Sequence, residues 1–446
     1  MSIGAARELA ERLGVDRVLV SGPEYQRASR VWNDAVRRRP AVVVRPASAA
    51  QVRTAVLVAR EHGLALSVKG GGHDWAGRAL NDGGLVVDLG GLREVTVDAG
   101  ARVATVEGGA TVRDVIAAAA PHGLLAVGGT VGGVGMAGLT LGGGYGPLVG
   151  RLGLAADNLL GATVVLADGR IVTADATAEP DLFWALRGGG GNFGVVTALR
   201  VRLHPVPRLV TGFALHAWPG AAAVLARLGD LLATAPDELT VPSGVISGPD
   251  GGPAVFLSPT WCGDEAAGGP VLDEVLGLGA PVVAERSPVT YHDLLARFEP
   301  YAAGGRHHEM RTRSLPGYTA GAIEALVAAG EARTSPLSGV VVHHFHGAAA
   351  RVPDDATAFG NRRDHLMVEI GAVWEPDDPA APHRAWTEEV WSALSGVALP
   401  GGYPSLLAPG DRDQIAHAYG DNAARLKGVK AHYDPHGVFT ATPLPF

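Results

Sequence analysis

A histidine in this chain follows directly after a run of glycines, where it could work on a bound ligand. Glycines 70–72 end the apolar segment 64–68 and are followed at once by His73. Three consecutive glycines weaken a strand or a helix, but they leave backbone N–H groups uncovered and allow close approach to a phosphate. The imidazole of His73 would then be held beside whatever the glycines bind. The competing interpretation is a surface turn with a solvated histidine.

The segment 366–374 carries one carboxylate in an otherwise apolar strand. Period-two alternation places Glu369 on the face opposite Val368 and Ile370. If the face of Glu369 lines a cavity, a desolvated carboxylate there is suited to take the proton of a substrate O–H or N–H group. The alternative is an acid on a solvated sheet face.

The glycine turn belongs to an expected α/β unit. A short apolar strand at 41–45 is bounded by prolines, and Ser48 caps a helix over 49–61 that stops before the strand leading to the turn. Strand, helix and strand in this order are typical of an α/β layer. Further elements are expected at 84–89 and 102–107 (strands), 111–120 (helix), 161–171 (hairpin), 181–187 (helix) and 195–203 (strand).

Two more glycine clusters lie at 128–146 and 188–194. Residues 133–138 match the dinucleotide fingerprint G-x-G-x-x-G, and Asp157 lies about twenty residues beyond it. That fingerprint needs a helix opening at its third glycine, and the glycines at 142–144 would break such a helix within two turns. The three glycine loops instead indicate one long ligand, of dinucleotide size, that is contacted at several points.

From Pro205 to about residue 406, strand-like runs alternate with Ala-rich helices. This pattern predicts an antiparallel sheet backed by helices, which often frames a substrate cavity. A helix over 411–430 and the turn after Tyr433 follow. With 446 residues, the chain is expected to be α+β and to form two domains.

Composition excludes several classes of partner. The net charge is −8 and no long basic run occurs, so nucleic acid and membrane are poor partners. No apolar run is long enough for a membrane span, and the N-terminus has the pattern of an amphipathic helix. The lone Cys262 excludes an intrachain disulfide and fits a cytoplasmic protein. No metal site is expected, and the Ala/Gly/Arg usage is typical of a GC-rich bacterial genome.

In combination, these stretches resemble berberine-bridge-enzyme-like flavoproteins of the vanillyl-alcohol oxidase superfamily. The resemblance is carried by residues 69–73, 134–146, 153–158, 180–194 and 433–435, and it runs through essentially the whole chain. It implies a PCMH-type FAD-binding domain with two subdomains at 1–206, completed by 407–446. It also implies a substrate domain at 207–406 with an antiparallel sheet backed by helices.

The family attaches the histidine after the three glycines covalently to the 8α-methyl group of FAD, which here means His73. Many relatives add a second link through a cysteine whose position is Val131 here. The resemblance therefore implies a single 8α-histidyl link, which makes the flavin a stronger oxidant. Val134 falls at the family's oxygen-gating position, and a valine there resembles relatives that react with O2.

The resemblance also implies the remaining site residues. Glu369 and Tyr403 are the expected catalytic residues. Glu369 matches the catalytic glutamate, and Tyr403 is the retained first tyrosine of a family segment whose second aromatic residue is lost here. Trp75 is expected on flavin or substrate, with a core tryptophan as the alternative. Apart from the resemblance, His308 and His344 are expected to bind substrate as polar groups of the cavity, with histidines on a sheet face as the alternative. The expected FAD contacts are Val68, Lys69, Gly70, Gly71, Gly72, Asp74, Gly77, Thr130, Val131, Gly135, Gly138, Leu141, Gly142, Tyr145, Gly146, Asp157, Gly194, Val195, Val196 and Tyr433.

The predicted function is that of an FAD-dependent oxidase. Glu369 takes a proton from an alcohol or amine of a small molecule, either a secondary metabolite or a sugar, while hydride moves to flavin N5. O2 then regenerates the flavin and leaves as H2O2. The alternatives are a dehydrogenase or an N5-oxygenating monooxygenase of the same fold, a flavoprotein without turnover, and a nicotinamide-binding protein. Neither the substrate nor the oligomeric state follows from the sequence.

Overall fold

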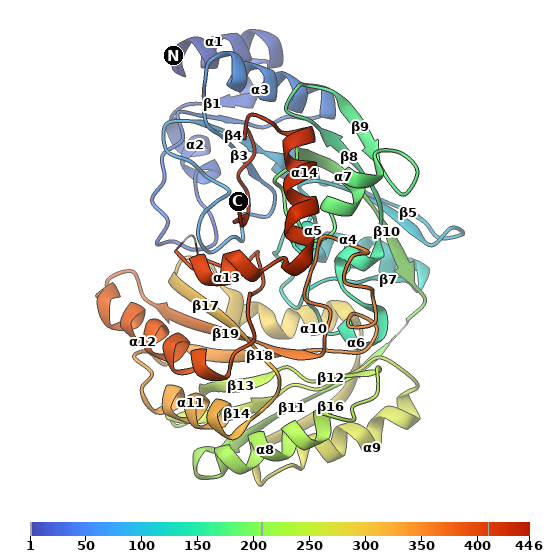
Figure 1. The fold of residues 1–446 in the computed structure, drawn as a ribbon, viewed down its shortest axis with the longest axis vertical. Coiled ribbons are helices and arrows are strands. Elements are labelled where there is room, and N and C mark those ends of the chain that lie inside the picture. The colour runs from blue at the N-terminus through green and yellow to red at the C-terminus, as the bar shows by residue number, and fades with distance from the viewer. Residues whose placement is uncertain (1, 207, 409) are drawn as a thin grey trace.

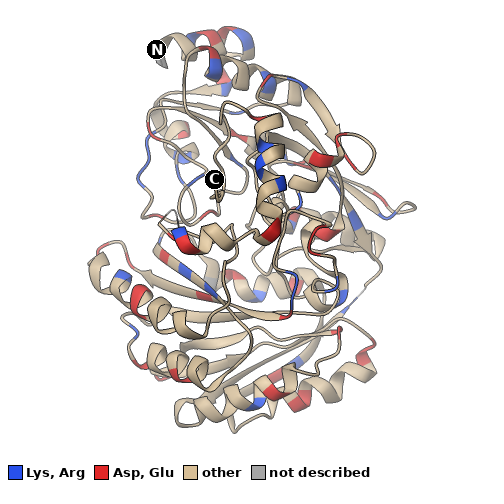
Figure 2. Cartoon of the chain, viewed as in Figure 1, with Lys and Arg blue, Asp and Glu red and all other residues tan. Residues whose placement is uncertain are grey.

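The computed structural model describes residues 2–206, 208–408 and 410–446, and within these ranges the strands form three sheets (Figure 1). The first two sheets and the C-terminal helices make up the upper half of the view in Figure 1, and the third sheet with its helices makes up the lower half. Figure 2 shows acidic and basic residues distributed over both halves. In the described part of the chain, no helix has the length and apolar character needed to cross a bilayer.

The first sheet has the order β1 (Val18–Leu19), β2 (Val42–Val44), β4 (Leu85–Asp88) and β3 (Leu66–Lys69), and β2 and β3 run parallel to β4. Helix α3 (Ala49–Glu61) connects β2 to β3 and begins where the Ser48 hydroxyl accepts the Gln51 N–H. This confirms the predicted strand–helix–strand unit. Because β3 ends at Lys69, the glycines 70–72 leave the sheet at the carboxyl ends of its parallel strands.

The second sheet is antiparallel and has the order β5 (Val95–Asp98), β6 (Val103–Glu107), β10 (Val195–His204), β8 (Leu159–Val165) and β9 (Ile171–Ala174), with β7 (Leu125–Ala126) beside β10. Helix α4 (Val112–Ala119) packs against it and starts with a capping box between Thr111 and Asp114. Helix α5 (Met136–Leu141) opens within the G-x-G-x-x-G stretch and ends at Gly142. The glycines 142–144 therefore stop this helix, as their positions predicted.

The third sheet has the order β12 (Leu239–Thr240), β15 (Thr260–Trp261), β11 (Leu209–Ala217), β14 (Pro253–Leu257), β13 (Ser243–Ser247), β18 (Gly339–Phe345), β19 (His365–Trp374) and β17 (His307–Leu315), with β16 (Pro281–Val289) beside β11. Four helices cover its outer face: α8 (Ala221–Leu232), α9 (Glu265–Leu276), α11 (Ala320–Glu331) and α12 (Ala380–Ala393). Val340, Val368 and Ile370 belong to the core on that side. The opposite face of the third sheet lies toward the glycine loops.

The remaining helices are short or peripheral: α1 (Ser2–Leu13), α2 (Gly22–Ala28), α6 (Val149–Leu152), α7 (Pro180–Ala185), α10 (Tyr291–Phe298), α13 (Arg412–His417) and α14 (Ala423–Tyr433). Helix α14 returns to the first half of the chain and packs on α7 (Figure 1). The predicted domain boundary at 206/207 lies between β10 and β11 and touches residue 207, which is outside the described residues. The domain limits stay a prediction.

Candidate active site

One cavity of about 370 Å3 lies where the glycine loops meet the third sheet. Its walls include glycines from all three loops, namely those at 70–72, at 129–135 and at 190–194. His343, Met367 and Glu369 line it from β18 and β19, and residues 439–442 of the C-terminal tail close another side. The three glycine loops therefore share one cavity, as expected for a ligand that is contacted at several points.

The first two glycine loops touch backbone to backbone. A Cβ atom at Gly135 would lie 2.5 Å from the backbone nitrogen of Gly71, and one at Gly71 would in turn lie 2.7 Å from the Cα atom of Gly135. Gly72 has a φ of +69°. Side chains at these places would push the loops apart and fill the cradle, so glycine is required for the close approach. A cradle of bare backbone that runs along an extended cavity fits a dinucleotide such as FAD.

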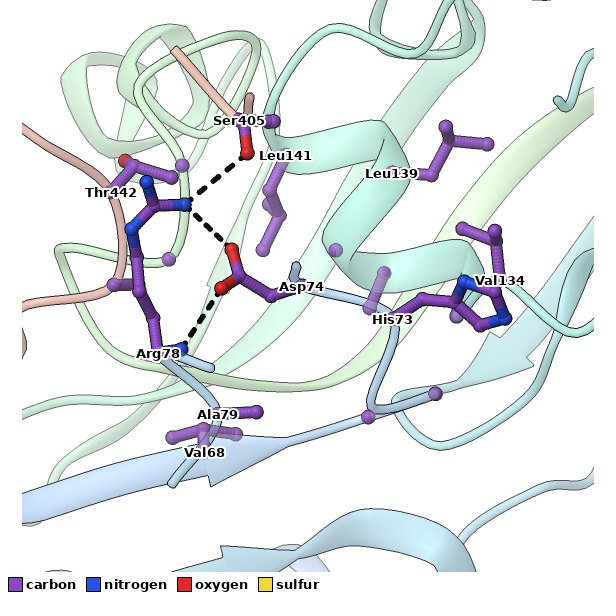
Figure 3. Close-up of a pocket in the computed structure, with 18 of the residues that line it drawn as sticks. Val68, His73, Asp74, Arg78, Ala79, Val134, Leu139, Leu141, Ser405 and Thr442 are labelled. Atoms are coloured by element: carbon purple, nitrogen blue, oxygen red, sulfur yellow. Dashed lines mark hydrogen bonds and ion pairs between the residues drawn. The ribbon is translucent and has the colours of Figure 1, made fainter. Parts of the chain in front are cut away.

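His73 lines this cavity beside Val134 (Figure 3), and Val131 belongs to the same lining. Its imidazole is stacked against Trp32, with ring centroids 5.0 Å apart and an angle of 21° between the planes. Burial lowers the pKa of His73 to about 4, so the ring is neutral at neutral pH. A neutral imidazole has a free nitrogen lone pair, which a nucleophile needs.

Asp74 and Arg78 form an ion pair at the cavity wall, with 2.6 Å between Arg78 Nη1 and Asp74 Oδ2 (Figure 3). The Arg78 guanidinium also donates to the carbonyl oxygens of Ser405 and Leu407, and so ties the segment 405–407 to the His73 loop. Sequence reasoning missed Arg78. The available signal was the spacing of four residues between Asp74 and Arg78.

Glu369 lines the cavity from β19, where it lies opposite Thr312 of β17 and Val341 of β18. The alternation of β19 is confirmed, since Val368 and Ile370 belong to the core on the other face. His343 shares the face of Glu369, and its Nε2 lies 3.7 Å from Glu369 Oε2. The carboxylate and the imidazole form the polar pair at this end of the cavity.

The two histidines expected to bind substrate lie outside the cavity. His344 lies on the opposite face of β18, buried and stacked on His346 with 3.7 Å between ring centroids. Burial lowers the pKa of His344, which keeps this stacked pair neutral. His308 stacks on Trp32 instead. In place of His344, its neighbour His343 points into the cavity, because adjacent strand residues face opposite ways.

An aromatic wall stands near Glu369. The rings of Tyr145 and Tyr403 meet edge to face with centroids 4.9 Å apart. The Tyr145 hydroxyl donates to His365 Nε2 over 2.9 Å, while the Tyr403 hydroxyl accepts the Gly144 N–H over 3.1 Å. Burial raises the pKa of both phenols, so both stay protonated. Trp75 completes this wall and donates its indole N–H to the Leu406 carbonyl.

Most of the expected cofactor contacts line the cavity. These are Val68, Gly70, Gly71, Gly72, Asp74, Thr130, Val131, Gly135, Gly138, Leu141, Tyr145, Gly194 and Val196. Lys69, Gly77, Gly142, Gly146, Asp157, Val195 and Tyr433 lie outside its lining. Three of these residues, Lys69, Asp157 and Tyr433, form side-chain hydrogen bonds or ion pairs with other residues of the chain.

Lys69 Nζ donates to the Ala28 carbonyl, Asp157 pairs with Arg362, and the Tyr433 hydroxyl donates to Glu179. Arg362 holds Asp157 through two charge-assisted hydrogen bonds of 2.7 and 2.9 Å. The carboxylate of Asp157 therefore faces a cation of its own chain and not the cavity. Among the described residues, no group of three His, Cys, Asp or Glu side chains is placed to hold a metal ion.

Comparison with known protein families identifies two regions of the chain. Residues 40–175 match the FAD binding domain family, and residues 411–443 match the family described as berberine and berberine like. The first match contains the His73 loop and the central glycine loop. The second contains α13, α14 and the start of the tail that lines the cavity.

Known proteins are similar over almost the whole chain. The FAD-linked oxidoreductase aurO of Gibberella zeae is 32% identical over 94% of this chain and 83% of its own. The (R)-6-hydroxynicotine oxidase of Paenarthrobacter nicotinovorans is 31% identical, with 93% of each chain covered. Among solved structures, the glucooligosaccharide oxidase of Acremonium strictum, with a 6-S-cysteinyl, 8α-N1-histidyl FAD, has the same fold, with a TM-score of 0.85, 23% identity and 99% of each chain covered.

These matches confirm the expected α+β fold with its PCMH-type FAD-binding part and its antiparallel sheet. They agree with the cavity, in which the glycine loops of the matched FAD-binding region face the third sheet. The chain belongs to the berberine-bridge-enzyme-like FAD-linked oxidoreductases of the vanillyl-alcohol oxidase superfamily.

Proposed function

We propose that this oxidoreductase is an oxidase that holds FAD through one covalent bond to His73 and oxidises an alcohol or amine of a small molecule. The observation that carries the proposal is that His73, Val134 and Glu369 line the same cavity. A group for attachment, a position for oxygen access and a base are thereby gathered around one ligand site.

The single link is supported by the residues around His73. Val131, which stands at the family's second attachment position, lines the cavity with an inert side chain. Cys262 is buried in the core elsewhere, and burial raises the pKa of its thiol. The doubly linked FAD of the Acremonium strictum enzyme has a cysteinyl bond, and no cysteine lines the cavity of this chain to form one.

The chain's own residues would handle the substrate proton. Glu369 accepts it from the O–H or N–H group, and His343, 3.7 Å away, stabilises the carboxylate or takes up the proton in turn. Tyr403, held by the Gly144 N–H, bounds the position of the reacting carbon. FAD, when bound, would supply the two-electron acceptor, and O2 would take up the two electrons together with two protons as H2O2.

The surroundings of Glu369 favour a compact apolar substrate. Met367, Tyr145, Tyr403 and Leu406 line the cavity near the Glu369–His343 pair, and they offer ring faces and methylene groups. A flat alcohol or cyclic amine, as found among secondary metabolites, can stack on such walls. A sugar chain needs many more hydrogen-bond partners for its hydroxyl groups, because each buried polar group must be satisfied.

The test compares the wild-type protein with His73→Ala. Both are precipitated with acid, and flavin fluorescence is followed on a denaturing gel. Fluorescence that stays with the wild-type chain and leaves His73→Ala supports the single link. A colourless wild-type protein would overturn the FAD proposal, and fluorescence retained by His73→Ala would place the bond elsewhere.

Turnover is tested separately by screening small alcohols and amines for peroxide release. An oxidase is reoxidised by air within each turnover, whereas a dehydrogenase stays reduced after substrate is added. An N5-oxygenating enzyme would incorporate oxygen into its product, and a flavoprotein without turnover would show no bleaching with any substrate. The same assay with Glu369→Gln asks whether the carboxylate takes part.

A further inference from the structure

Trp32 and Asn33 belong to a short segment that precedes β2. This segment lies between the His73 loop and the third sheet. The indole of Trp32 is stacked between two imidazoles. Its centroid is 5.0 Å from that of His73 at an interplanar angle of 21°, and 3.8 Å from that of His308 at 29°. His308 belongs to β17, so this column of three rings crosses from the FAD-binding part to the third sheet.

Asn33, the next residue, holds both sides with its amide group. Its Nδ2 donates to the Trp75 carbonyl over 2.7 Å and to the His308 carbonyl over 2.9 Å. Its Oδ1 accepts the His308 N–H over 3.0 Å. Asn33 is only 3% exposed, and these bonds join the loop that contains His73 to the start of β17.

The plane of the Trp32 ring is set by hydrogen bonds at both ends of the residue. The backbone N–H of Trp32 donates to the Gly72 carbonyl over 2.9 Å, and the indole Nε1–H donates to the Ala302 carbonyl over 2.8 Å. The ring therefore covers one face of His73. A Cβ atom at Gly133 would lie 3.3 Å from His73 Nε2, which shows how close the other loop passes.

We propose that Trp32 and Asn33 form a clamp that pre-orients the His73 imidazole for covalent attachment of FAD. The inference rests on the proposed function. The step joins an imidazole nitrogen to the 8α carbon and removes one hydrogen from each. The two electrons and two protons pass through the flavin to O2, which leaves as H2O2. Fixing the ring beforehand avoids the loss of rotational freedom when the bond forms.

The clamp also shields one face of the half-buried imidazole from water. Burial lowers the pKa of His73 to about 4, and the pKa of His308 to about 4, so both rings stay neutral above pH 5. The charged and titratable neighbours of the stack come from four places. They are Arg306 and His307, which precede His308 in the chain, Asp74 paired with Arg78 on the loop, Lys69 before the glycine turn, and Arg113 paired with Glu299 beside Gly132. Without Trp32, water would reach the His73 ring and its pKa would rise toward the ordinary value.

The test follows covalent attachment itself, apart from turnover. The full chain is produced under riboflavin limitation, FAD is added, and acid-stable flavin is measured over time. We expect Trp32→Leu to slow attachment roughly 10–100-fold, as a misplaced reacting group does. Trp32→Phe, which keeps a ring, should restore most of the rate. Trp218→Leu removes a half-buried tryptophan far from the cavity and should leave the rate unchanged.

The pH dependence separates positioning from a loss of structure. In the wild-type protein the rate should be flat from pH 5.5 to 8, whereas in Trp32→Leu it should fall below about pH 6.5, the ordinary pKa of histidine. If Trp32→Leu does not fold, Trp32→Met fills the space without a rigid plane and should show the same slowing. A wild-type rate and a flat pH profile in these variants would overturn the clamp. A wild-type protein that never forms acid-stable flavin would overturn the proposed link itself.

Discussion

The ion pair between Asp157 and Arg362 is expected to stabilise the fold and not to bind the cofactor. Arg362 is only 2% exposed and Asp157 11% exposed, and their side chains share two hydrogen bonds of 2.7 and 2.9 Å. Arg362 also donates to the Ala349 carbonyl and to the Thr357 hydroxyl. Asp157→Ala would leave a buried guanidinium without its counter-charge.

Removal of one partner from a buried ion pair lowers the free energy of unfolding by about 3–5 kcal/mol. With about 2–4 °C of Tm per kcal/mol for a cooperative unit of about 150–250 residues, the midpoint should fall by roughly 6–20 °C if each expected domain unfolds as one unit. Asp157→Ala combined with Arg362→Met removes both charges, so the loss should be smaller than the sum of the two single losses. Thermal unfolding followed by circular dichroism measures these shifts, and absorbance at the flavin bands measures the FAD content.

The control is Asp181→Ala, which breaks an exposed pair with Arg425 and should change the stability by less than about 1 kcal/mol. The reasoning would be refuted if Asp157→Ala melted like the wild type but held less FAD. Asp157 would then be a cofactor ligand, as the family resemblance implied.

Three further predictions test the cavity and its surroundings. Glu369→Gln should lower kcat by about 10²–10⁴-fold in a peroxide-release assay while acid-stable flavin stays at the wild-type amount. Gly135→Ala should reduce the FAD bound per chain, because its methyl group would meet the backbone of Gly71, whereas Gly428→Ala, which meets nothing within 4 Å, should not. Burial lowers the pKa of His365 to about 4, so the unfolded chain binds its proton first as the pH falls, and the free energy of unfolding should drop by about 3 kcal/mol between pH 6.5 and 4. His365→Gln should flatten that part of the plot of Tm against pH; an unchanged slope would contradict this assignment.

Local patterns were sufficient to predict much of this site. The glycine runs identified three loops, and alternation along β19 identified the face of Glu369, because both signals depend only on neighbouring residues. Neither signal supported the expectation that His344, and not His343, binds substrate. Alternation separates the two residues, but which face meets the cavity depends on helices packed from distant parts of the chain.

Contacts between residues that are far apart in the sequence could not be predicted from local patterns. Arg78 reaches the Ser405 carbonyl 327 residues away, and Asn33 reaches His308 across 275 residues. Nothing near Trp32 in the sequence indicates that its ring would stand between His73 and His308. Asp157 shows the opposite case, in which a spacing typical of one fold occurs in another and the carboxylate has a different partner.

The position of the tail in the cavity wall has a consequence for the order of events in the cell. Residues 439–442 line the cavity, and Asn192 fixes them through its side-chain oxygen, which accepts the N–H groups of Ala441 and Thr442. Chains begin to fold from the N-terminus while they are still being translated. The glycine loops and Glu369 are therefore made while this wall is still missing. Stable flavin retention should begin only after residues 439–442 have left the ribosome, and nascent chains stalled before these residues emerge should be colourless.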